Sequence, residues 1–87
     1  MKKTILLIDD EEHIRRLLQF VLRPIDAILQ VTRNGMEALA YLVKNPVAVA
    51  LLDYSLPGMN GLETLQQIRS LKEGGDIKVI MLTARDQ

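Results

Sequence analysis

Three carboxylates and a hydroxyl stand directly after short apolar segments of the chain. Asp9 and Asp10 follow the first segment, Asp53 follows the third and Thr83 follows the fourth. If these segments are parallel strands of one sheet, the four side chains gather at its carboxyl edge, where open α/β sheets bind their ligands. Carboxylates that share a site repel one another, and the pKa of one of them rises unless a cation intervenes. Oxygen ligands of this kind suit Mg²⁺, so the pattern predicts a magnesium site.

The same residues suggest phosphoryl chemistry. An aspartate beside a divalent cation can act as a nucleophile toward phosphorus and form an aspartyl phosphate, and Thr83 would then donate its hydroxyl to a phosphoryl oxygen. Each residue alone has a simpler explanation, because Asp9 or Asp10 can cap a helix and Asp53 can belong to a Pro-Gly turn. The joint pattern, drawn from separate strands, favours a site over coincidence.

Four apolar segments are typical of strands, and they span residues 4–8, 28–32, 47–52 and 78–82. The first, third and fourth barely alternate between apolar and polar residues, which indicates parallel strands buried on both faces. The second alternates more and is expected at an edge of the sheet.

Helical patterns separate these strands. Apolar residues spaced along one helix face fill the first interval, and they are Ile14, Leu17, Leu18, Val21 and Leu22. Pro24 ends this helix. The next two helices begin at Asn34 and Asn60, each followed three residues later by a glutamate, as in a capping box. The order β-α-β-α-β-α-β predicts an α/β fold with a parallel sheet, although half of a (β/α)-barrel would alternate in the same way.

The composition indicates one small globular domain over residues 1–87. The chain has 11 basic and 11 acidic residues, and this zero formal charge argues against binding nucleic acid or anionic membranes through bulk charge. It has no cysteine, which excludes disulfides and cysteine-based zinc sites. The apolar segments are too short to cross a bilayer, and acidic residues follow the first one without a signal-peptide core. We therefore expect a cytoplasmic protein.

Three ordered motifs resemble the receiver domain of two-component response regulators. They are ILLIDD at residues 5–10, LLDYSLPGMNG at 51–61 and VIMLTA at 79–84. The resemblance covers essentially the whole chain, and three motifs in order are far more specific than Leu-Pro-Gly alone. It implies a flavodoxin-like, doubly wound parallel sheet whose strands run in the order 2-1-3-4.

The resemblance also implies roles for the site residues. Asp53 matches the phosphoacceptor, which takes a phosphoryl group from a sensor histidine kinase or a phosphotransfer protein. Asp9 and Asp10 match the acidic pair that binds Mg²⁺ together with Asp53. Ser55 matches the residue whose backbone carbonyl is a further ligand of the ion.

The third motif carries the predicted switch. Thr83 matches the hydroxyl that moves toward the phosphoryl group, and Ala84 matches a small residue that leaves room for it. The family continues with a helix, a fifth strand ending in Lys-Pro and a last helix, whereas this sequence stops at Gln87. We therefore expect a receiver domain truncated after the fourth strand, with slower phosphorylation because the Lys is missing. The fourth strand would be a bare apolar edge that forms a homo-oligomer or a domain swap.

Two other functions remain open. The chain could be a receiver-derived interaction module that no longer switches because the Lys-bearing strand is absent. A haloacid-dehalogenase-type phosphatase also uses an aspartate nucleophile and Mg²⁺, but it needs a second Asp at the position of Ser55. The leading interpretation is a phosphoacceptor that controls an unknown output domain or partner. It is not a metabolic enzyme, and it binds neither nucleic acid nor a membrane directly.

Overall fold

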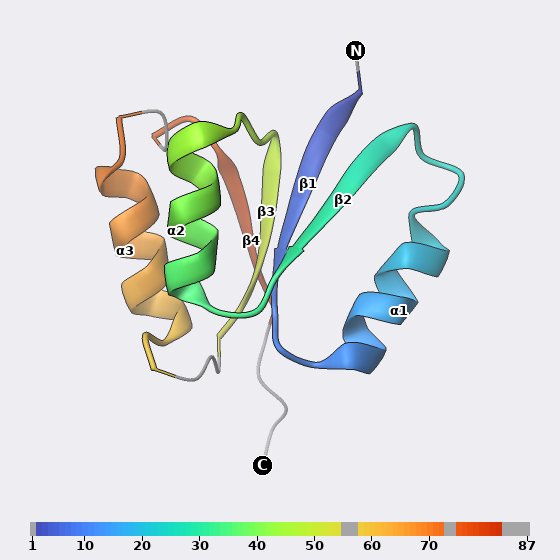
Figure 1. Cartoon of the computed structure of the whole chain (residues 1–87), viewed down its shortest axis with the longest axis horizontal. Coiled ribbons are helices and arrows are strands. Elements are labelled where there is room, and N and C mark those ends of the chain that lie inside the picture. Colours follow the sequence, from blue (N-terminus) through green and yellow to red (C-terminus); the bar gives the residue numbers. More distant parts are fainter. Residues whose placement is uncertain (1, 55–57, 73–74, 83–87) are drawn as a thin grey trace.

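The computed structural model describes residues 2–54, 58–72 and 75–82, and within these ranges strands and helices alternate as predicted (Figure 1). The elements are β1 (Lys3–Ile8), α1 (Glu12–Val21), β2 (Ala27–Thr32), α2 (Gly35–Lys44), β3 (Val49–Asp53), α3 (Gly61–Ser70) and β4 (Lys78–Leu82). The third strand begins two residues later than expected, because an apolar pattern does not distinguish a strand from the apolar loop that leads into it. None of the described helices has the length and hydrophobicity needed to span a bilayer.

The strands form one parallel sheet in the order β2-β1-β3-β4. This order confirms the flavodoxin-like expectation and the prediction that β2 lies at an edge. In the register of the sheet, Ile8 at the end of β1 pairs with Thr32 of β2 on one side and Leu52 of β3 on the other. At the end of β3, Asp53 pairs with Leu82 of β4. The carboxyl ends of β1 and β3 are therefore neighbours at the centre of the sheet.

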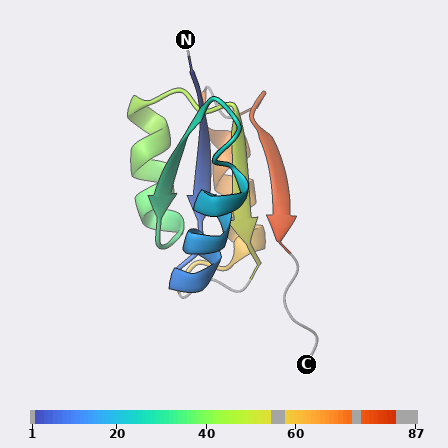
Figure 2. The same cartoon turned by 90° about the vertical axis from the view of Figure 1, so that its right-hand side faces the viewer.

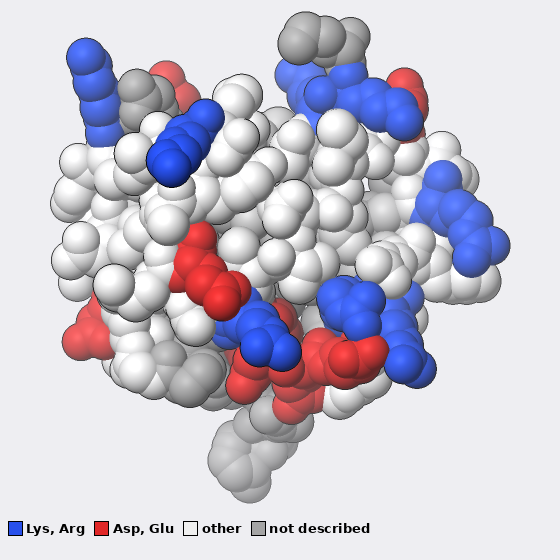
Figure 3. Space-filling model, in the orientation of Figure 1, with Lys and Arg blue, Asp and Glu red and all other residues white. Residues whose placement is uncertain are grey.

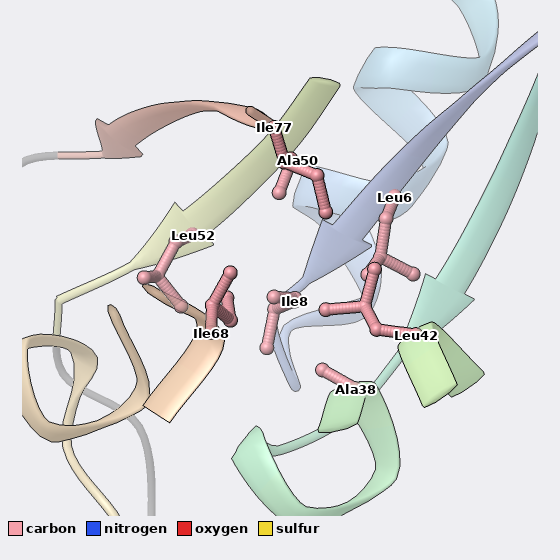
Figure 4. Packing of buried hydrophobic residues seen from close by; sticks show 8 residues of the cluster. All are labelled: Leu6, Ile8, Ala38, Leu42, Ala50, Leu52, Ile68 and Ile77. Carbon is pink, nitrogen blue, oxygen red and sulfur yellow. The ribbon is translucent and has the colours of Figure 1, made fainter. Parts of the chain in front are cut away.

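The main core lies between the sheet and the helix pair α2 and α3, which share one face (Figures 1 and 2). Strands, helices and the turn before β4 all contribute to it, and the buried apolar cluster consists of Leu6, Ile8, Ala38, Leu42, Ala50, Leu52, Ile68 and Ile77 (Figure 4). Burial of these side chains removes apolar surface from water and fixes α2 and α3 on the sheet. The core therefore holds the strand ends at a defined position.

The opposite face carries only α1 among the described helices (Figure 2). No residue of α1 is buried, and Leu17 and Val21 on its apolar stripe are 55% and 52% exposed. Ile80 of β4 is 53% exposed on the same side of the sheet. The prediction that strand 78–82 is buried on both faces is therefore wrong for the described residues, whereas β3 has only buried and half-buried positions.

The starts of α2 and α3 use their asparagine caps differently. At α3, Asn60 accepts a bond of 2.9 Å from the amide of Glu63, whose carboxylate accepts one of 3.1 Å from the amide of Asn60. This is a complete capping box. At α2, Asn34 accepts from the amide of Glu37, but the Glu37 carboxylate accepts instead from the amide of Arg33 at 2.8 Å. The predicted helix starts are confirmed, and only the second has the full reciprocal box.

Candidate functional site

Three aspartates converge at the carboxyl edge of the sheet. Asp9 and Asp10 leave β1, and Asp53 is the last residue of β3. Because β1 and β3 pair directly, the three side chains can each offer a carboxylate oxygen within 4.8 Å of the others. The sequence predicted this convergence from the strand ends alone. Figure 3 shows acidic side chains gathered along the lower edge of the molecule, where the strands of Figure 1 end.

Backbone contacts fix the position of Asp9. Its side chain lies inside the protein, and the residue is only 5% exposed. Its amide donates a bond of 3.0 Å to the carbonyl oxygen of Thr32, and its Oδ1 accepts a bond of 2.9 Å from the amide of Glu11. The hydroxyl of Thr32 in turn donates to the carbonyl oxygen of Leu7 at 3.0 Å. The sequence did not predict these contacts, because they depend on how β2 lies against the end of β1.

The surroundings of Asp9 disfavour its charged form. Burial raises the pKa of the Asp9 carboxyl above its ordinary value, and the hydrogen bond from the Glu11 amide opposes this effect. The nearby carboxylates of Asp53, Glu11 and Asp10 raise the pKa further. Asp10 is exposed and Asp53 is half-buried, so the site extends from the protein interior at Asp9 to the solvent at Asp10. Such a set of oxygen ligands suits a hard divalent cation.

A groove of about 420 Å³ opens beside the aspartates. Asp9 and Asp53 lie at its acidic end, while Leu17, Leu18 and Leu82 contribute apolar lining from α1 and β4. The sequence predicted the acids but not this groove. The signal in the sequence was the apolar stripe of α1, which shows the apolar side of the helix but not how much of that side is covered.

The remaining predicted site residues, Ser55, Thr83 and Ala84, lie outside the described residues. Their neighbours are nevertheless placed. Leu82 pairs with Asp53 in the sheet, and its carbonyl oxygen accepts a bond of 3.3 Å from the amide of Tyr54. The backbone immediately before Thr83 therefore lies beside the strand end that carries Asp53.

A parallel sheet of this order is a flavodoxin-like doubly wound fold, which binds its ligands at the carboxyl ends of the strands. Residues 5–87 match the response regulator receiver domain, and the chain belongs to this family. The family match argues against the haloacid-dehalogenase alternative.

Individual relatives agree with this assignment. The chain is 40% identical to the uncharacterized transcriptional regulatory protein YkoG of Bacillus subtilis, over 98% of this chain and 36% of that protein. It is 37% identical to the transcriptional regulatory protein SrrA of Staphylococcus aureus, over 100% of this chain and 35% of that protein. The chain therefore spans about a third of the length of these relatives.

A solved structure shares the fold. The response regulator TrrA of Thermotoga maritima, solved in complex with Mg²⁺-BeF, superposes with a TM-score of 0.85 at 38% identity. The match covers 97% of this chain and 71% of that one.

Proposed function

We propose that this chain is a phosphoacceptor receiver in which Asp53 takes a phosphoryl group from the phosphohistidine of a sensor histidine kinase or a phosphotransfer protein. Phosphorylation then changes the affinity of the domain for an output domain or partner, in the cytoplasm. The observation that best supports this proposal is the convergence of Asp9, Asp10 and Asp53 at the carboxyl edge of the sheet. Membership of the receiver domain family also supports phosphoryl transfer to Asp53.

The donor set fits Mg²⁺. All three side chains offer oxygen, their oxygens lie within 4.8 Å of one another, and mutual repulsion and burial favour the arrival of a cation. The complex of TrrA with Mg²⁺-BeF supports the same assignment. Asp9, Asp10 and Asp53 would hold the ion, and the carbonyl of Ser55 is the further ligand predicted from the sequence. When bound, the ion would neutralise part of the negative charge of the incoming phosphoryl group.

The transfer itself is a substitution at phosphorus. A carboxylate oxygen of Asp53 forms a bond to phosphorus while the bond between phosphorus and the imidazole nitrogen of the donor breaks. The nitrogen keeps the bonding electron pair and takes up a proton from solvent. Asp53 is half-buried at the acidic end of the groove, so the donor approaches from the solvent side of the sheet edge. As the resemblance to receiver domains implies, Thr83 would then donate its hydroxyl to a phosphoryl oxygen, and Ala84 would leave space for the group.

Labelling with a small phosphodonor tests the proposal. The chain is incubated with acetyl phosphate and Mg²⁺, and intact mass spectrometry is expected to show the gain of one phosphoryl group, which peptide mapping assigns to Asp53. Asp53→Asn and chelation of Mg²⁺ should each abolish the gain. Asp26→Asn is the matched control, because Asp26 is an exposed acid that precedes β2 at the other end of the sheet.

Two results would overturn the proposal. One is a label that persists in Asp53→Asn, and the other is a wild-type chain that takes up no phosphoryl group. If the wild-type chain is unlabelled but still binds a partner, and Asp53→Asn binds it equally well, the interaction-module alternative is supported instead.

Self-association through β4 is a further part of the proposal. Among the described strands β4 pairs only with β3, and its outer edge therefore offers backbone donors and acceptors. The strand has a single charge, at Lys78, and its central Ile80 is 53% exposed. A second copy would pair with this edge directly or by exchange of the strand. The homo-oligomer would complete the hydrogen bonding of β4 and place a neighbouring strand beside Ile80.

A further inference from the structure

The first residue of α3 lies directly against the backbone that carries Asp53. Gly61 is buried, and its amide donates a bond of 2.9 Å to the carbonyl oxygen of Tyr54. A Cβ atom added to Gly61 would lie 2.7 Å from the carbonyl oxygen of Asp53 and 2.7 Å from the Cα of Tyr54. Both separations are well inside van der Waals contact. Only glycine therefore allows the helix to approach the end of β3 this closely.

The backbone of Tyr54 is also bonded to β4. Its amide donates to the carbonyl oxygen of Leu82 in β4 at 3.3 Å. The backbone of Tyr54 is therefore hydrogen-bonded both to β4 and to the start of α3. Any side chain at position 61 must displace either the helix or the strand end.

The helix is the better anchored of the two. The capping box of Asn60 fixes its first turn, and the hydroxyl of Thr64 donates to the carbonyl oxygen of Asn60 at 2.9 Å. Further along, Ile68 is 0% exposed in the main core. Leu52 of β3 is also 0% exposed, but beyond it the strand end is less buried, since Asp53 is half-buried and Tyr54 is exposed. A clash at position 61 is therefore relieved mainly by movement of Asp53.

We infer that Gly61 is a positioning residue for Asp53. Its missing side chain lets α3 support the end of β3 at the position where the Asp53 carboxylate meets those of Asp9 and Asp10. This inference rests on the proposed function of Asp53, and it adds a residue that touches neither the metal nor the phosphoryl group.

Two other glycines of the chain provide matched controls. A Cβ on Gly35 at the start of α2 would lie 2.5 Å from the side-chain oxygen of Thr64, so its clash is with a side chain of α3 rather than with the backbone of the strand end. A Cβ on Gly75 would meet no atom of the described structure within 4 Å. A comparison of Gly61→Ala with Gly35→Ala and Gly75→Ala therefore distinguishes displacement of Asp53 from a loss of stability caused by a steric clash elsewhere.

Each variant is titrated with Mg²⁺, labelled at saturating acetyl phosphate and unfolded with urea. Gly61→Ala is expected to weaken Mg²⁺ binding and to slow labelling on the order of tenfold to a hundredfold, as small misplacements of reacting groups do. Gly35→Ala should lose stability but keep the affinity and rate of the wild type. Gly75→Ala should match the wild type in all three measurements. If Gly61→Ala does not fold in buffer, all chains are compared in trimethylamine N-oxide, which favours the compact state.

The outcomes separate this inference from the proposed function. A wild-type chain that is not labelled on Asp53 refutes the proposed function. A labelled wild type together with a folded Gly61→Ala of unchanged Mg²⁺ affinity and rate overturns the positioning role. The positioning role also fails if Gly35→Ala loses affinity and rate as strongly as Gly61→Ala.

Discussion

The amide of Glu11 donates a hydrogen bond of 2.9 Å to Oδ1 of Asp9, two residues earlier in the chain. This is the local bond by which an aspartate shapes a turn before a helix. The same Asp9 carboxylate faces Asp10 and Asp53 across the edge of the sheet. The side chain of Asp9 therefore shapes the entry to α1 and also lies in the acidic cluster with Asp10 and Asp53.

Asp9→Asn should stabilise the metal-free protein at neutral pH. Burial, with the neighbouring carboxylates, raises the pKa of Asp9. A carboxyl whose pKa is higher when folded holds its proton more tightly in the folded state, so the free energy of unfolding falls as pH rises through its unfolded and folded pKa values. Asparagine keeps an oxygen for the Glu11 amide and removes the charge. In chelator at pH 7, thermal melts should give Asp9→Asn the higher Tm.

Two further measurements test whether the charge of Asp9 destabilises the metal-free protein. The difference in Tm should shrink below the ordinary carboxyl pKa of about 3.9, where the wild-type side chain is also neutral. Mg²⁺ should raise the Tm of the wild type more than that of Asp9→Asn, because the variant has lost a ligand. A lower Tm for Asp9→Asn in chelator at pH 7 would contradict the electrostatic account.

Leu52→Ala should destabilise the fold by about 2–5 kcal/mol, because it leaves a cavity in a packed core. Leu52 is 0% exposed on β3, one residue before Asp53. Leu62→Ala is the control, since Leu62 on α3 is 48% exposed and its truncation should change stability by no more than about 0.5–1 kcal/mol. Urea unfolding followed by circular dichroism gives both values. Equal losses would show that the main core is not where the structure places it.

Asn60→Ala should destabilise the protein by about 0.5–2 kcal/mol through loss of the helix cap. The reciprocal box also predicts coupling, because Glu63 bonds back to the Asn60 amide at 3.1 Å. A double-mutant cycle of Asn60→Ala with Glu63→Ala should show a favourable interaction energy. The corresponding cycle at Asn34 and Glu37 should show less, since the Glu37 carboxylate bonds to a different amide. Larger coupling at α2 than at α3 would refute this distinction.

Ile80→Lys should weaken self-association, because charged side chains block pairing at the edges of sheets. Ile28→Lys is the matched control at the other edge, where Ile28 of β2 is 47% exposed. Sedimentation velocity over a range of concentrations should show an oligomer for the wild type and Ile28→Lys, and a monomer for Ile80→Lys. A wild-type chain that stays monomeric at every concentration contradicts association through β4.

The sequence predicted the features that depend on strand ends and helix caps. The meeting of Asp9 and Asp53 could be predicted because apolar segments defined parallel strands, and such strands end at a common edge. The exposure of Leu17 could not be predicted, because a stripe shows which side of a helix is apolar but not how much of that side is covered. The role of Gly61 was hidden for a related reason, since its contact with the Asp53 carbonyl arises only when α3 packs on the sheet.

The pairing of β1 with β3 also fixes when the acidic site forms. Asp9 leaves the first strand and Asp53 ends the third, so two helices and one strand must be synthesised between them. A nascent chain that holds only β1, α1 and β2 has no such site, and carboxylate repulsion arises only as β3 closes against β1. Repulsion that appears at this late step changes mainly the unfolding rate, because it acts after most of the sheet has formed. A cation held there would lengthen the lifetime of the folded state more than it would speed folding.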